Sequence, residues 1–141
     1  MAEMAGRAGA KSRPEFRNIH VSQLSSYRLP LAGIVSILHR ISGALMFLVG
    51  IPFILYLFEQ SLTSEISFEN YRAIISGSFA KLVLLALIWA YLHHFCAGIR
   101  YLVMDVHLAL DKDQARGTAM SVLVVSLTLT FVIGLKLFGV F

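Results

Sequence analysis

The stretch LAGIVSILHRISGALMFLVGIPFILYLF, residues 31–58, decides the fold class. Arg40 is its only charged residue, and the stretch is longer than the ~20 residues with which an α-helix crosses a hydrocarbon core ~30 Å thick. It begins too far into the chain, and runs too long, to be a cleaved secretory signal. The stretch therefore predicts a first transmembrane helix that stays in the mature protein.

Two further apolar blocks of comparable length follow it. Apolar residues make up 57% of the chain, which is more than a soluble protein of this size can readily bury. We therefore predict an all-α integral membrane protein with three transmembrane helices, at about 31–58, 79–104 and 118–139. An N-terminal segment, residues 1–29, precedes this anchor domain, residues 30–141.

The composition also excludes several classes of function. Cys96 is the only cysteine, so the chain has neither a disulfide framework nor a thiolate metal cluster of its own. The formal net charge is +4, but no basic stripe with interleaved aromatic residues is present, which argues against nucleic-acid binding. Any iron–sulfur chemistry must therefore sit in a partner.

Basic residues are distributed unevenly between the two sides of the predicted spans. The connection between the first two helices contains acidic residues against few basic ones: Glu59, Glu65 and Glu69 against Arg72 and Lys81. The N-terminal segment and the end and loop of the second helix are richer in base: Arg7, Lys11, Arg13, Arg17, Arg28, Arg100, Lys112 and Arg116. The positive-inside rule then predicts a cytoplasmic N-terminus and a periplasmic C-terminus.

The first predicted helix carries a polar face near its cytoplasmic end. Its members are spaced to share one side of a helix: Ser36, His39, Arg40 and Gly43. Ionisable groups within a span are disfavoured by roughly 2.5–3.5 kcal/mol, so each needs a partner or a function. A hydroxyl and a guanidinium one turn apart suit the carbonyl oxygen of a membrane-dissolved ligand. Alternatively, Arg40 reaches lipid phosphates and His39 packs at the interface.

The second predicted helix carries a stripe of small side chains around one histidine. Every fourth position belongs to this stripe: Ala86, Ala90, His94 and Gly98. Such a groove lets a flat macrocycle approach the backbone, so His94 is a better candidate for an axial ligand than His93. The stripe that contains His93 and Trp89 is bulkier, and we interpret it as more interfacial. The alternative is that the small residues only pack helix on helix, with a histidine hydrogen-bonding across.

The predicted orientation brings both polar clusters to the same half of the membrane. The polar face lies near the start of the first helix, which begins at the cytoplasm. His94 lies near the end of the second helix, which returns to the cytoplasm. A cofactor near His94 could therefore have its acidic groups met by His39 and Arg40.

At these positions the chain resembles a known family. The strings SILHRISG, residues 36–43, and HHFCAGIRYLVMD, residues 93–105, are similar to the two signature regions of the cytochrome b subunit of succinate dehydrogenase. The match in length and helix count covers nearly the whole chain. Some relatives have a histidine directly after G-I-R, where this chain has Tyr101.

The resemblance implies roles for individual residues. Ser36 and Arg40 would line a ubiquinone pocket, and His94 would be an axial ligand of haem b. His39 and Arg40 would approach the haem propionates. Weaker candidates for the apolar wall of the quinone pocket are Leu24, Leu29 and Ile37. Ser36 would hydrogen-bond a ring oxygen, and Arg40 would stabilise the negative charge that develops on the ring.

The resemblance also implies a complex of four subunits in a heteromeric helix bundle. A flavoprotein would oxidise succinate, an iron–sulfur protein would pass electrons to ubiquinone, and a second small three-helix anchor would supply the other haem ligand. This chain alone would carry neither the flavin nor the dicarboxylate site. The absence of a long transit segment favours a bacterial inner membrane over a mitochondrial one.

Two other classes of function compete with this interpretation. Within the redox class, the rival is the anchor of a quinol:fumarate reductase, which runs the chemistry in reverse. Apart from the resemblance, the rivals are a haem-free membrane anchor and a transporter subunit that uses His94 and Arg40 as a proton path. A haem absorption spectrum of purified membranes separates these two from the redox class.

Overall fold

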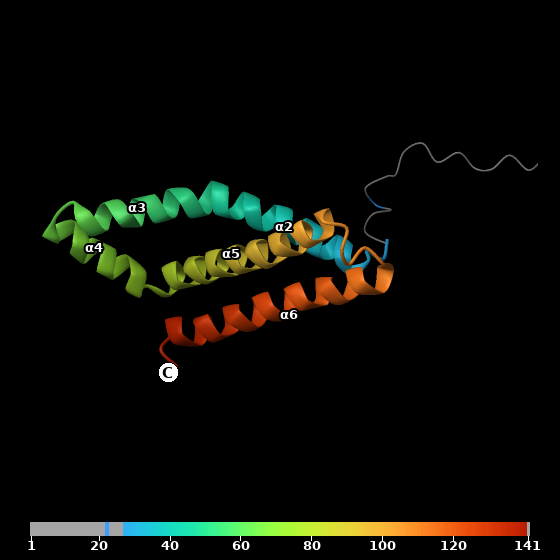
Figure 1. Cartoon of the computed structure of the whole chain (residues 1–141). Coiled ribbons are helices and arrows are strands. Elements are labelled where there is room, and N and C mark those ends of the chain that lie inside the picture. Colours follow the sequence, from blue (N-terminus) through green and yellow to red (C-terminus); the bar gives the residue numbers. More distant parts are fainter. Residues whose placement is uncertain (1–21, 23–26, 141) are drawn as a thin grey trace, which may run out of the picture.

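The computed structural model describes residues 22 and 27–140, and its regular structure is entirely helical (Figure 1). The elements follow one another in this order: α2 (Leu31–Leu45), a π-helical turn η1 (Met46–Gly50), α3 (Ile51–Leu62), α4 (Glu65–Ser76), α5 (Ser78–Asp105) and α6 (Lys112–Leu137). Three helical stretches within the described chain are long and apolar enough to cross a membrane. The predicted all-α fold with three spans is confirmed.

The first span is one continuous helical stretch, Leu31–Leu62, formed by α2, η1 and α3. Pro30 precedes it with an extended backbone, and its missing N–H is harmless at a helix start. Pro52 lies within the stretch and cannot donate the helical hydrogen bond, and its ring crowds the preceding turn. The backbone widens into η1 just before this proline, and the helix bends there (Figure 1).

The connection between the first two spans contains a helix that the sequence interpretation left out. Ser64 caps α4: its hydroxyl accepts from the backbone N–H of Ser67, and the Ser67 side chain accepts from the Ser64 N–H in return. This arrangement satisfies two N–H groups that a helix start leaves free. No side chain of α4 is buried, and the helix is too short and too rich in polar residues to form an apolar block of membrane-spanning length.

The third span begins earlier than its apolar block. The helix α6 starts at Lys112, whereas the apolar block starts at Thr118. Asp111 precedes the helix and Asp113 lies in its first turn, where a carboxylate interacts favourably with the positive end of the helix dipole. Polar residues therefore extend α6 by more than a turn beyond its hydrophobic part.

The helix α5 packs against both α2 and α6, and α2 also touches α6 (Figure 1). A compact core lies where the three meet, at Val35, Ala97, Ala119 and Val122. Small side chains let the helix backbones approach closely, and close packing is what holds helices together in lipid.

Beyond the π-helical turn, α3 diverges from the rest of the bundle. Within the described chain it packs against η1 and α4 but not against α5 or α6. An entirely apolar groove of about 480 Å³ opens along this divergence. Its walls are formed by Met46, Gly50, Ile51, Ile54, Leu84, Leu87, Ile88, Tyr91, Leu92 and Ile133.

Candidate functional site

The structure brings the two polar clusters into direct contact. The imidazole rings of His39, on α2, and His94, on α5, stack with centroids 4.0 Å apart and planes 15° apart. The Nδ1 atom of His94 lies 3.1 Å from the backbone oxygen of His39. Because Nδ1 is engaged by a carbonyl, it carries the proton, and Nε2 is left with its lone pair free.

Two neighbours on α2 complete the surroundings of the His94 ring. Ser42 is fully buried; its hydroxyl donates to the His39 oxygen at 2.8 Å and lies 3.3 Å from His94 Nδ1. A Cβ atom at Gly43 would lie 3.0 Å from His94 Cε1, so the ring would have to shift by a few tenths of an ångström to admit it. Gly98 on α5 faces the His39 ring in the same way, but a Cβ atom there would lie 3.9 Å from Nε2 of His39, which is an ordinary contact distance.

His93 faces the other way, into the bundle. Its side chain is 0% exposed, its ring stacks on Trp89, and its Nδ1 lies 3.4 Å from the Ser126 hydroxyl on α6. Nε2 is buried with no hydrogen-bond partner within residues 27–140. The interpretation of the His93 stripe as interfacial was therefore wrong: the third span covers it. His94 is only partly buried.

The predicted quinone-pocket residues lie in and before the first turns of α2. Ser36 is partly buried and Arg40 is exposed, and neither forms a hydrogen bond or ion pair with any other described residue. Ile37 and Leu29 are each 41% exposed. Leu24 lies outside the described residues.

Arg100 has a role that the sequence interpretation missed. It is 6% exposed, and its guanidinium donates to the Thr118 hydroxyl at 3.1 Å and to the Ala115 carbonyl at 3.3 Å. It also lies over the ring of Tyr101. Arg100 thus ties the end of α5 to the start of α6, whereas the charge count treated it as one more cytoplasmic cation.

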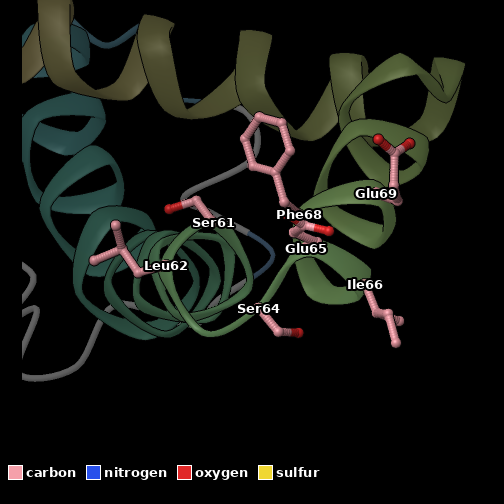
Figure 2. A pocket seen from close by; sticks show the side chains of 7 residues that line it. All are labelled: Ser61, Leu62, Ser64, Glu65, Ile66, Phe68 and Glu69. Carbon is pink, nitrogen blue, oxygen red and sulfur yellow. The ribbon is translucent and has the colours of Figure 1, made fainter.

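A wide hollow lies elsewhere, at the turn between α3 and α4 (Figure 2). Its volume is about 720 Å³, and it is a wide surface depression lined by Ser61, Leu62, Ser64, Glu65, Ile66, Phe68 and Glu69. This turn lies at the opposite end of the bundle from the start of α2 (Figure 1), so none of the predicted site residues lines the hollow.

The donor set suits a prosthetic group held by one ligand better than a bare metal ion. The described residues contain no group of three or more His, Cys, Asp or Glu side chains that could hold a metal ion. His94 offers a single nitrogen, oriented by the backbone of another helix. A haem needs one axial ligand from each side, so these residues fit one half of such a site.

Comparison with known proteins identifies the class to which the chain belongs. A family model described as the succinate dehydrogenase/fumarate reductase transmembrane subunit matches residues 14–133. The chain belongs to this family.

Individual relatives narrow the assignment. The succinate dehydrogenase cytochrome b556 subunit of Coxiella burnetii is 35% identical over 104 residues, which cover 73% of this chain and 82% of the relative. The subunit of the same name from Paracoccus denitrificans is 32% identical over 118 residues, covering 84% and 89%. That of Rickettsia felis is 32% identical over 111 residues, covering 78% and 85%. The resemblance to the cytochrome b anchor of succinate dehydrogenase is confirmed.

Proposed function

We propose that this chain, as the membrane-anchor cytochrome b subunit of a succinate dehydrogenase, holds haem b through His94 and positions ubiquinone through Ser36 and Arg40. The observation that carries the proposal is the contact of His94 Nδ1 with the His39 carbonyl, 3.1 Å away. Metal-ligating histidines commonly donate their second nitrogen to a carbonyl or carboxylate, which fixes the tautomer and the ring orientation. A bound haem b supplies a centre that takes up and releases one electron.

The choice between the adjacent histidines rests on their surroundings. His93 is fully buried with its Nδ1 beside Ser126 of α6, and a porphyrin could reach Nε2 only by opening the helix packing. His94 is partly exposed and has its Nδ1 satisfied. These features favour His94 as the axial ligand and give His93 a structural role.

His39 and Arg40 are the side chains available to the haem propionates. The His39 ring lies against that of His94, and Arg40 is exposed and unpaired among the described side chains. A guanidinium binds a carboxylate with two parallel hydrogen bonds, and such a pair is strengthened by partial removal from water. We propose that these two residues orient the macrocycle and that Arg40 neutralises its acidic edge.

The quinone site is proposed on the neighbouring part of α2. Ser36 lies one turn before Arg40, and Ile37 and Leu29 expose apolar surface beside them. The Ser36 hydroxyl would hydrogen-bond a ring oxygen, and Arg40 would stabilise negative charge on the ring as it is reduced. Leu24 is proposed for the same apolar wall from its sequence position alone.

The partners are proposed from the family to which the chain belongs. The second axial histidine is proposed to come from another three-helix anchor, and electrons from an iron–sulfur subunit that is itself supplied by a flavoprotein. Arg28, Lys112 and Arg116 are exposed at the end of the bundle where α2 and α6 begin. This end is proposed to face the cytoplasm of a bacterial inner membrane, with the C-terminus periplasmic.

The test compares two histidine variants of the intact complex. His94→Leu should abolish or alter the haem absorption spectrum, while His93→Leu should retain it. Dye-linked succinate oxidation in the same membranes shows whether the complex has assembled. The proposal fails if assembled His94→Leu complex has the wild-type spectrum, or if only His93→Leu loses it.

A further inference from the structure

The geometry points to a seat on α2, formed by the His39 carbonyl, the Ser42 hydroxyl and the bare backbone of Gly43, which positions the axial imidazole of His94. We propose that Ser42 and Gly43 are positioning residues that set how strongly His94 binds haem iron and at what potential the haem is reduced. This inference rests on the proposed function and assigns a role to two residues outside the proposed ligand, propionate and quinone sets.

The polar side of the seat consists of two oxygens that face one nitrogen. His94 Nδ1 lies 3.1 Å from the His39 oxygen and 3.3 Å from the Ser42 hydroxyl, so its N–H can be shared between them. The Ser42 hydroxyl in turn donates to the His39 oxygen at 2.8 Å, which holds all three groups in register. Hydrogen bonds to the non-coordinating nitrogen raise the basicity of the ligand.

The hydrogen bonds to His94 Nδ1 predict the direction in which the midpoint potential of the haem shifts. A more basic imidazole stabilises the ferric form relative to the ferrous form, because it donates more electron density to the iron. Removing the Ser42 hydroxyl leaves the His39 carbonyl as the only acceptor, so the imidazole donates less. The midpoint potential should then move to a more positive value.

The steric side of the seat is Gly43. A Cβ atom there would lie 3.0 Å from Cε1 and 3.3 Å from Nδ1 of His94, closer than nine in ten real Cβ contacts. Cε1 is bonded to Nε2, so any displacement of the ring moves the coordinating atom as well. Gly43→Ala should tilt the imidazole away from its proposed axial direction.

A purely structural role is the alternative, and the chain offers matched controls for it. Ser121 on α6 also donates to a carbonyl within its own helix, that of Gly117, at 3.1 Å, but it is exposed and touches no histidine. Gly117 has nothing within 4 Å of an added Cβ. Ser121→Ala and Gly117→Ala therefore repeat the two chemical changes away from the seat.

The experiment purifies the intact complex carrying each of the four substitutions and His94→Leu. Haem content, the reductive midpoint potential and the low-spin ferric resonance of the haem are measured for each. Ser42→Ala should keep its haem with a raised potential and a shifted resonance. Gly43→Ala should weaken haem retention by roughly the 10–100-fold seen when partners of metal ligands are lost. Both controls should match the wild type.

The outcomes separate the seat from the function on which it rests. Wild-type potential and resonance in both Ser42→Ala and Gly43→Ala, with haem lost in His94→Leu, overturn the seat and leave the proposed function standing. A wild-type complex without haem, or an assembled His94→Leu complex with unchanged haem, overturns the function itself. If Gly43→Ala fails to assemble, the potential of Ser42→Ala decides alone.

Discussion

The imidazole rings of His39 and His94 lie nearly parallel, 4.0 Å apart, on two different helices. The contact has two separable parts, because the polar bond to His94 comes from the backbone of His39 and only the stacking comes from its side chain. A substitution at position 39 therefore removes the ring without removing the carbonyl that orients His94. This separation makes the role of the His39 side chain testable.

We predict that His39→Ala keeps the haem in place but weakens its retention, by no more than about tenfold, the lower end for partners of metal ligands. The loss reflects the missing hydrogen-bond donor near the propionates, while the seat of His94 is intact. Haem content after dilution in detergent measures the effect. Complete loss of haem would show instead that the His39 side chain is needed for coordination.

We predict that Ser36→Ala and Arg40→Leu each lower succinate-driven ubiquinone reduction while dye-linked succinate oxidation stays near the wild-type rate. The reason is that both side chains are proposed to act on the quinone ring and neither on succinate. Arg116→Leu is the matched control, because Arg116 is an exposed cation at the same end of the bundle. Equal losses in the two assays would refute the proposed roles.

We predict that Arg100→Leu destabilises the subunit by about 1–2 kcal/mol, because its bonds to Thr118 and Ala115 tie α5 to α6. Thr118→Val should lose part of the same free energy, and the double variant should lose less than the sum of the two. Thermal unfolding of the detergent-solubilised complex measures this. Full additivity would mean that the two side chains do not interact.

We predict that Ser126→Ala is destabilising by about 1 kcal/mol, because it leaves His93 fully buried without its only side-chain hydrogen-bond partner. Adding His93→Leu to it should restore stability, since an apolar pair of similar shape leaves no polar group unsatisfied. Thermal unfolding again provides the measurement. A double variant less stable than Ser126→Ala alone would contradict this reasoning.

The sequence predicts most of the helical architecture, because transmembrane helices are defined by the length and continuity of apolar blocks. It also placed the Ser36–Gly43 face and His94 in the same half of the bundle, and the structure puts His39 against His94. The helix α4 was missed because it is short, mixes polar with apolar residues and is capped by a serine pair. The π-helical turn depends on how the helix accommodates Pro52, which sequence patterns describe only as a bend.

The environments of individual polar residues were less accessible from sequence. Whether His93 faces lipid or another helix depends on which side α6 packs, and periodicity within α5 carries no information about α6. In the sequence, Arg100 indicates only the orientation of the chain in the membrane; its hydrogen bonds to α6 are visible only in the structure. Ser42 was noted only as part of the string SILHRISG. Its contact with His94 depends on how α2 and α5 pack against each other.

The central claim is that His94 coordinates haem iron, and replacing its imidazole with a thioether tests this most directly. His94→Met in the intact complex should either lose the haem or retain it with an altered spectrum and a more positive midpoint potential, as a methionine ligand produces. An assembled His94→Met complex whose spectrum and potential equal those of the wild type would contradict the account.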